Sequence, residues 1–187
     1  MAAKFFPGYR VVVYNTAGSY NSTGERRNPL PGFVNAYSVP ELCAALRAAG
    51  SEGPARVCFT PLRSGNKREV FNDVCFLVCD FRNVIFAVEE IWNFQAPNWS
   101  PDALNECYLQ WAHYGLRLMW NAQIPQKTDS ALRSMTLDVY VGQFDRTLDL
   151  NAIADCRLPP EAMAQVRRLP KRKFIHRMES GEWRVEP

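Results

Sequence analysis

The sequence predicts an α/β fold with a mostly parallel central sheet flanked by helices. Short apolar runs rich in β-branched residues, such as RVVVY (10–14) and VIFAV (84–88), are typical of buried strands. Segments with helix capping signals alternate with them. A chain of 187 residues, 47% of them hydrophobic, is long enough to bury the core of a single domain. We expect a core at 10–158, followed by a C-terminal helix and hairpin at 159–187.

The expected helices have clear start or stop signals. In SVPELCAALRAAG, Ser38 and Glu41 have the spacing of a capping box, and Gly50 ends the pattern. In SPDALNECYLQWAHYG, Ser100 stands at the N-cap position, directly before a proline in the first turn. We expect helices at 38–50, 67–81, 100–115, 128–135 and 159–169.

Apolar runs between these helices predict the strands. Most runs are continuous rather than alternating, as in parallel strands that are buried on both faces. The final segment, KFIHRMESGEWRVEP, predicts a hairpin that turns at Ser180-Gly181. The polar stretch at 15–32 is rich in Gly and Pro and has no periodic pattern, which is often a sign of function or disorder. The other expected strands are 10–14, 55–61, 84–88, 116–123 and 137–144.

Charge gives a weak indication of partners. Lys and Arg number 22 against 19 Asp and Glu, a net charge of +3. A basic cluster near the C-terminus fits contacts to the DNA backbone, although a solvated helix and hairpin explain it equally well. Its members are Arg167, Arg168, Lys171, Arg172, Lys173 and Arg177.

Cysteine and histidine usage indicates no metal site. Six cysteines lie mostly in apolar runs, and the CxxxC spacing of Cys75 and Cys79 fits neither zinc nor thioredoxin-type motifs. We expect reduced core thiols. His113 and His176 lack metal-ligand spacing; we expect His113 to pack on its helix and His176 to lie at the surface. There is neither a membrane-span-length apolar run nor a signal-peptide core, so we expect a cytoplasmic protein.

Polar residues follow several expected strands, at the edge where open parallel sheets bind ligands. Asn15 follows the first strand. Glu89 and Glu90 follow VIFAV, and Asn121 and Gln123 close LRLMWNAQ. One carboxylate can hold Mg²⁺ while the other polarises an attacking water, and a neighbouring amide can sense a phosphate. Adjacent residues of a strand point in opposite directions, so the two glutamates need not share one task. Alternatively, both are surface residues where the strand meets solvent.

The order of these motifs resembles the second half of ATPases of the FtsK–HerA superfamily, which includes DNA translocases and viral genome-packaging ATPases. The resemblance rests on VIFAVEE, then HYGLRLMWNAQIP, then TDSALRSMTLDVYVGQF, and spans roughly residues 10–178. It implies a P-loop NTPase (RecA/FtsK–HerA)-like core, with ATP and Mg²⁺ as ligands and DNA as a partner. It also implies a ring-shaped homo-oligomer. If the protein is viral, it implies a location in the cytoplasm of the host cell.

The resemblance also implies roles for single residues. Glu89 takes the position of the Mg²⁺-binding carboxylate, which is usually Asp in the family, and Glu90 that of the catalytic base. Gln123 takes the sensor position at the end of its strand. Arg133, with Arg117 as the alternative, takes the role of an arginine finger offered to a neighbouring subunit.

The phosphate-binding loop departs from the family. The pattern GxxxxGK[ST] is absent, and the nearest stretch, GSYNSTGER (18–26), has its glycines too far apart and Glu25 where lysine belongs. Nine residues precede RVVVY, so we expect the family's first strand and P-loop helix to be missing. Arg26 and Asn15 are then the candidate nucleotide-binding residues.

The sequence is compatible with three functions. The first is a degenerate or partner-dependent packaging or translocase ATPase that acts in an assembly on DNA. The second is an active ATPase that uses an unusual phosphate loop at 16–28. The third is a non-enzymatic binding module, whose partner surface includes Trp92, Phe94 and Trp99 unless these aromatics cover the core.

Overall fold

The computed structural model describes residues 8–16, 30–50, 53–61, 66–109 and 115–187. By its internal contacts the chain divides into two compact units. The first comprises Met1–Phe94 and Ser100–Ala122, and the second comprises Gln95–Trp99 and Gln123–Pro187. The division does not coincide with residue 158, and the single domain expected from the sequence stays a prediction.

The first unit is built on a sheet of five parallel strands in the order β2–β3–β1–β4–β5. This confirms the predicted class. The central strands are apolar on both faces, as their continuous hydrophobic runs require. The strands are β1 (Arg10–Tyr14), β2 (Val34–Ala36), β3 (Arg56–Phe59), β4 (Val84–Val88) and β5 (Arg117–Trp120).

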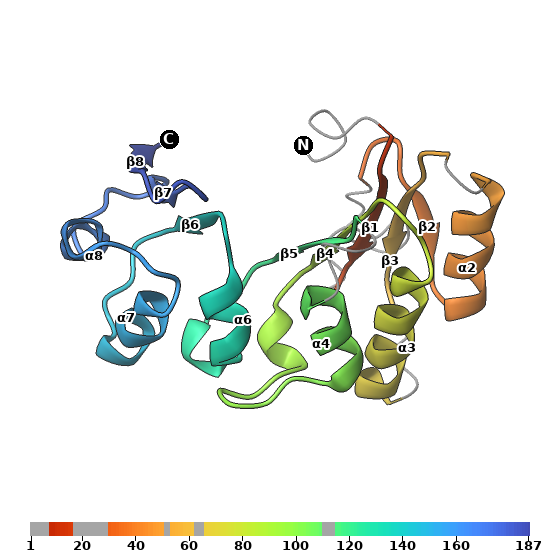
Figure 1. Ribbon diagram of the computed structural model, residues 1–187, viewed down its shortest axis with the longest axis horizontal. Coiled ribbons are helices and arrows are strands. Elements are labelled where there is room, and N and C mark those ends of the chain that lie inside the picture. The colour runs from red at the N-terminus through yellow and green to blue at the C-terminus, as the bar shows by residue number, and fades with distance from the viewer. Residues whose placement is uncertain (1–7, 17–29, 51–52, 62–65, 110–114) are drawn as a thin grey trace. The chain divides into compact units, whose positions relative to one another are not determined.

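Three helices lie side by side along this sheet: α2 (Val39–Ala48), α3 (Lys67–Cys79) and α4 (Asp102–Leu109) (Figure 1). The hydroxyl of Ser38 accepts a hydrogen bond from the Glu41 N–H, which begins α2 as the capping signal predicts. α3 buries the apolar face expected from its spacing, made of Phe71, Val74, Cys75 and Val78. A short 3₁₀ helix, η1 (Ile91–Asn93), follows β4.

Aromatic rings form the part of the core next to the strand ends. Phe94 stacks on Phe71, with ring centroids 4.0 Å apart and planes 7° from parallel. Tyr14 meets both rings edge-on, at 5.2 Å and 5.4 Å. All three side chains are buried. The end of β1 and the segment after β4 are therefore fixed against α3 by direct packing.

The second unit has a small antiparallel sheet of β6 (Val139–Val141), β7 (Phe174–Arg177) and β8 (Trp183–Glu186). The predicted hairpin at Ser180-Gly181 joins β7 to β8. Apolar residues of this sheet pack with α7 (Thr147–Ala154) and α8 (Pro160–Val166) in one cluster that includes Val141, Ile153 and Ile175. The unit also contains η2 (Pro125–Lys127) and α6 (Ser130–Met135).

Three elements differ from the sequence prediction. β2 was not expected, because three residues give no apolar run. α7 was not expected either, because Arg146 precedes it and makes no side-chain cap. The predicted strand at 137–144 forms as β6 but pairs with β7 and lies outside the parallel sheet.

All six cysteines are present as thiols. Within the ranges that the structure describes, no helix combines the length and apolar character needed to cross a membrane.

Candidate functional site

The carboxyl ends of the parallel strands meet at one edge of the sheet. Tyr14 at the end of β1 lies opposite Phe59 on one side and Val88 on the other, and Val88 lies opposite Trp120. The polar residues that come directly after these strands are therefore neighbours: Asn15, Thr60, Glu89 and Asn121. The strands β2 and β3 lie on one side of β1, whereas β4 and β5 lie on the other, so the strand order reverses between β1 and β4. Ligands of open α/β sheets bind at this kind of reversal.

Hydrogen bonds connect the residues on the two sides of this reversal. The hydroxyl of Thr16, just after β1, donates to the Glu89 carbonyl at 2.6 Å. The Glu89 N–H in turn donates to the Tyr14 carbonyl at 3.1 Å. The positions of β1 and of the first glutamate are thus fixed relative to each other by backbone and side-chain contacts.

Asn15 is fully buried at the same edge. Its Nδ2 donates to Oγ1 of Thr60 at 2.9 Å, which joins the ends of β1 and β3. Its Oδ1 is also buried and has no donor among the described residues. A buried amide oxygen without a donor is costly unless water or a ligand supplies one.

Glu90 leaves the strand direction. Its φ of 50° and ψ of 53° are left-handed, an uncommon conformation for a residue with a side chain. Oδ1 of Asn121 accepts a hydrogen bond from the Glu90 N–H at 2.7 Å, and the Asn93 side-chain amide donates to the Glu90 carbonyl at 3.0 Å. The indole N–H of Trp92 donates to the Glu90 carboxylate. These contacts hold the turn and orient the carboxylate.

Glu89 has different surroundings. Burial raises the pKa of Cys58 in β3 to about 11, and the negative charge of Glu89 adds to this increase. The first carboxylate is thus electrostatically coupled to β3, whereas the second contacts the Trp92 indole. The two glutamates therefore have different neighbours, and separate tasks for them stay a prediction.

Two other predicted site residues cannot be assigned to this edge. Gln123 falls in the second unit and stays a prediction as a phosphate sensor. Arg26 and the stretch 18–26 lie outside the described residues, as does His113. Asn121 is instead the amide that contacts a glutamate at this edge.

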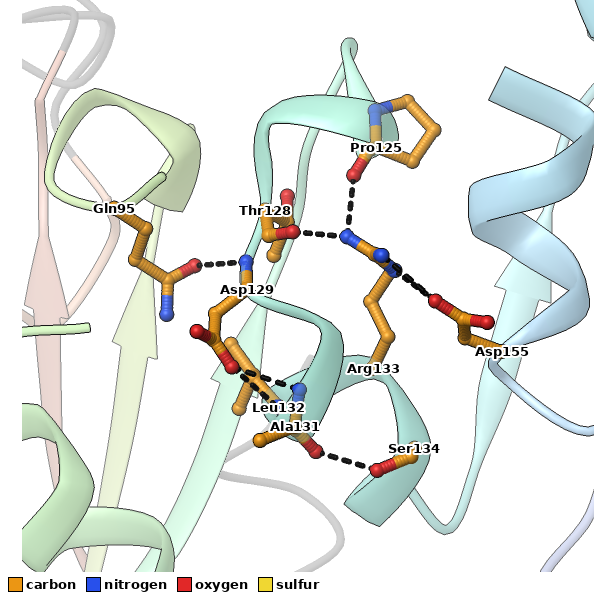
Figure 2. Close-up of polar contacts among 9 residues, drawn as sticks. All are labelled: Gln95, Pro125, Thr128, Asp129, Ala131, Leu132, Arg133, Ser134 and Asp155. Carbon is orange, nitrogen blue, oxygen red and sulfur yellow. Dashed lines mark hydrogen bonds and ion pairs between the residues drawn. The ribbon is translucent and has the colours of Figure 1, made fainter. Parts of the chain in front are cut away.

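Arg133 lies in the second unit and is 6% exposed. Figure 2 shows its polar contacts. Its Nε and Nη2 donate to Oδ2 of Asp155 at 3.1 Å and 2.7 Å. Its Nη1 donates to the Pro125 carbonyl at 3.0 Å and also to the Thr128 carbonyl. In this conformation the guanidinium binds its own chain, and a role across a subunit boundary stays a prediction.

Five of the six residues of the predicted basic cluster lie at the surface, and their contact with DNA stays a prediction. Including Arg177 in this cluster was wrong, because Arg177 is buried and donates to the Thr136 carbonyl at 2.7 Å. It points to the packed face of β7, where alternation along the strand places it. The other five members are exposed, and none forms an ion pair within the described part of the chain: Arg167, Arg168, Lys171, Arg172 and Lys173.

The structure decides between the two alternatives for Phe94 and corrects one expectation about His176. Phe94 is 2% exposed and belongs to the aromatic core, as the core alternative predicts, whereas Trp99 is 47% exposed. The expectation that His176 lies at the surface is wrong. His176 is buried, because the Tyr140 ring stacks on it with centroids 4.0 Å apart. Cross-strand pairing of β6 with β7, which the sequence does not reveal, brings these two rings together.

Sequence reasoning missed Thr16 and Thr60, whose hydroxyls tie the strand ends together. The signal that identified Asn15 would also have found them, since both lie within two residues of the end of an apolar strand. Asn121 was noted as a polar strand end, but its contact with Glu90 depends on the left-handed turn.

Comparisons with known proteins identify the fold. No protein-family model and no curated protein matches the chain. Among solved structures, the genome packaging NTPase B204 from Sulfolobus turreted icosahedral virus 2 in complex with ATP-gammaS has a TM-score of 0.74 at 13% identity, covering 100% of this chain and 85% of that chain. The chain has the fold of a viral genome-packaging NTPase.

Further structures of this fold give the same result. The genome packaging NTPase B204 from Sulfolobus turreted icosahedral virus 2 in complex with AMPPCP has a TM-score of 0.72 at 13% identity. The match again covers 100% of this chain and 85% of that chain. The DNA-packaging ATPase B204 from Sulfolobus Turreted Icosahedral Virus has a TM-score of 0.68 at 12% identity with the same coverage. The resemblance drawn from the sequence is confirmed at the level of the fold.

Proposed function

We propose that this chain is a viral DNA-packaging type of ATPase whose nucleotide site is degenerate or completed by a partner. The nucleotide lies at the carboxyl ends of the parallel strands, beside Glu89 and Glu90. Glu90 polarises the attacking water, Gln123 senses the terminal phosphate, and Arg133 acts toward a neighbouring subunit. The proposal joins the fold of the packaging NTPases with the polar groups at this edge.

The observation that carries the proposal is the pair of glutamates at the reversal of strand order. Glu89 is fixed to the end of β1 through Tyr14 and Thr16, and Glu90 is turned away from it by Asn121. Buried Asn15, with an Oδ1 that lacks a donor among the described residues, adds a polar group to the same edge. Parallel sheets of this kind bind nucleotides here.

The residues at this edge fit Mg²⁺ in the manner usual for nucleotide sites. No group of three His, Cys, Asp or Glu side chains in the described residues could hold a metal. Mg²⁺ commonly binds through one or two carboxylates together with waters and phosphates, so Glu89 alone would suffice on the protein side. When bound, the ion would supply charge compensation for the phosphates.

Weak nucleotide binding by the chain alone follows from its phosphate loop. The sequence contains no Gly-Lys dipeptide, so the lysine of the usual P-loop pattern is absent. Phosphoryl transfer depends on positioning and charge compensation, and two carboxylates with an amide provide little of either. A second copy of the chain or another protein would supply the missing groups.

DNA is the proposed macromolecular partner, bound through the five exposed members of the basic cluster. Affinity would fall steeply with salt, because each phosphate contact releases counterions. Neutralising Arg167, Arg168 and Lys171 to Lys173 together should therefore flatten the salt dependence of binding.

Calorimetry with Mg·ATP tests the nucleotide site. We expect the purified chain to bind more weakly than the micromolar range and to show negligible turnover. Micromolar affinity that is lost in Glu89→Gln and Glu90→Gln, but kept in the control Glu179→Gln, would overturn the degenerate part of the proposal. Steady turnover abolished by Arg26→Ala would favour an active enzyme with an unusual phosphate loop. Absence of any nucleotide response, even when DNA and a second subunit are present, would favour a binding module.

A further inference from the structure

The outer face of the small antiparallel sheet carries aromatic and basic side chains. Along β6 and β7 the apolar residues Val139, Val141 and Ile175 point into the core of the second unit. Alternation then places Tyr140 and Phe174 on the opposite face. In the strand register, Tyr140 lies opposite His176, and His176 lies opposite Arg184.

The Tyr140 ring stacks on the His176 ring, whose position is fixed by other contacts. The two rings lie nearly parallel, 13° apart with centroids at 4.0 Å. His176 Nδ1 lies 3.1 Å from Glu186 Oε1, and its Nε2 lies 3.4 Å from Asp138 Oδ1. Tyr140 nevertheless remains 60% exposed. One face of the Tyr140 ring therefore packs on an imidazole that is itself fixed by two carboxylates. A large part of the Tyr140 surface stays open to solvent.

Phe174 adds a second ring to this face. It is 41% exposed and stands two residues before His176 on β7, which is about 7 Å along a strand. It is the diagonal neighbour of Tyr140 across the β6–β7 pair. Exposed aromatic rings at such spacing on a sheet are the arrangement on which successive unpaired bases stack.

A cationic turn leads directly into Phe174. The Lys173 N–H donates to the Pro170 carbonyl at 3.1 Å, which closes a turn with Arg172 near its tip. Arg172 has a φ of 65°, a conformation that favours glycine. Position 172 thus carries a long cationic side chain, although a glycine would adopt this backbone conformation with less strain. Lys171, Arg172 and Lys173 are all exposed.

Acidic groups on the face are already engaged. Glu186 accepts from Arg184 Nε at 2.6 Å as well as contacting His176, and Asp138 contacts the same imidazole. Apart from buried Arg177, residues 167–187 carry six exposed Lys or Arg against three Glu. The surroundings of the two rings therefore attract an anionic polymer rather than repel it.

We propose that this face binds an unpaired nucleic-acid strand. Bases stack on Tyr140 and Phe174, while phosphates contact the turn at Lys171, Arg172 and Lys173. The inference rests on the proposed function in one respect, the choice of DNA as partner, and it is independent of the nucleotide site. It adds the form of the strand and the rings that receive it.

Fluorescence anisotropy of the full chain tests this, without nucleotide and with Mg²⁺ chelated. The probes are a labelled oligo-dT of about 20 nucleotides and a duplex of equal length. We expect tighter binding of the single strand. Tyr140→Leu should weaken single-strand binding about tenfold and leave duplex binding unchanged, because it removes one stacked base. Phe76→Leu, at a 49% exposed ring in the first unit, is the control and should change neither.

Arg172→Gly tests the turn, since it removes the charge and relieves the strained φ. The slope of log affinity against log salt should fall by about 0.7 for the single strand. Arg157→Gly is the matched control, because Arg157 is also exposed with a φ of 58°. It should leave the slope unchanged.

The outcomes separate this inference from the proposed function. Equal affinity for both probes, or no effect of Tyr140→Leu, would overturn the stacking face and leave duplex packaging as the function. Equal losses in Arg157→Gly and Arg172→Gly would overturn the turn as the phosphate contact. Single-strand binding that persists while no nucleotide response appears, even with DNA and a second subunit present, would instead count against the proposed ATPase. Thermal unfolding confirms that each variant is folded.

Discussion

Nη2 of Arg133 lies 2.7 Å from Oδ2 of Asp155, which joins α6 to the residue that ends α7. The two groups differ in exposure, since the Arg133 side chain is 7% exposed and that of Asp155 is 42% exposed. Arg133 also donates to the carbonyls of Pro125, the first residue of η2, and of Thr128, which directly follows η2. One buried guanidinium therefore holds three segments of the second unit, and positioning is its evident role in this conformation.

Replacing Arg133 should destabilise the protein more than replacing Asp155. Arg133→Met leaves two backbone carbonyls without a donor, and we expect a loss of about 2–4 kcal/mol in the free energy of unfolding. Asp155→Asn keeps a hydrogen-bond acceptor at a half-exposed site, and we expect about 1 kcal/mol. Urea denaturation measures both. Arg168→Met, at an exposed arginine, is the control and should change stability by less than about 0.5 kcal/mol.

If Arg133→Met were as stable as the wild type, Arg133 would not hold the three segments of the second unit together. If that variant also lost nucleotide turnover in an assembled state, Arg133 would act outside its own chain, as the family resemblance implies.

Asn121 should fix the left-handed turn at Glu90. Its Oδ1 accepts the Glu90 N–H at 2.7 Å, so Asn121→Leu removes the acceptor and should cost about 1–2 kcal/mol. Asn121→Asp keeps an acceptor oxygen and serves as the matched control, with a smaller loss. Thermal unfolding compares the two. Equal losses in both variants would show that the amide nitrogen of Asn121 matters instead of the oxygen.

The sequence predicted four of the five strands of the first unit, because their signal is local. A run such as VIFAV must be buried on both faces, and β4 covers the predicted residues without a shift. Capping at Ser38 is equally local. Arg10 shows the limit: it opens the first apolar strand, yet it is fully buried and donates to the Arg82 carbonyl at 3.1 Å. That partner lies 72 residues away in the sequence, so the residue pattern of the strand does not predict the contact.

The site divides in the same manner. The edge position of Asn15 and Glu89 follows from strand polarity, which the sequence gives through the α/β alternation. The turn at Glu90 does not, because its left-handed backbone depends on contacts with Asn121 and Asn93 from outside the strand. His176 and Arg177 were misplaced for a related reason: their burial depends on which strand pairs with β7.

Stability should depend on pH through Glu186. Contacts with His176 and then Arg184 hold the pKa of this carboxyl below its ordinary value of 4.5. A carboxyl whose pKa is lower in the folded state stabilises the protein above its unfolded pKa, and this contribution is lost as pH falls through the folded value. The free energy of unfolding should therefore decline more steeply below pH 4.5 in the wild type than in Glu186→Gln.

Urea titrations above and below that pH measure the difference. The control is Glu182→Gln, an exposed glutamate of the same hairpin that makes no ion pair within the described residues. Parallel pH profiles for wild type and Glu186→Gln would show that the contacts with His176 and Arg184 contribute nothing to stability.

Phe94 and Trp99, two aromatic residues that follow β4, should differ in how much their truncation destabilises the protein. Phe94 is 2% exposed and stacks on Phe71 at 4.0 Å, so Phe94→Ala leaves a cavity in the aromatic core and should cost about 3–5 kcal/mol. Trp99 is 47% exposed, and Trp99→Ala should cost about 1 kcal/mol because much of its surface stays in water in either state. Chemical denaturation of both variants measures these losses. Phe94→Leu keeps most of the buried volume and should lie between them. A small loss in Phe94→Ala would contradict its place in the core and would return WNFQAPNW to the candidates for a partner surface.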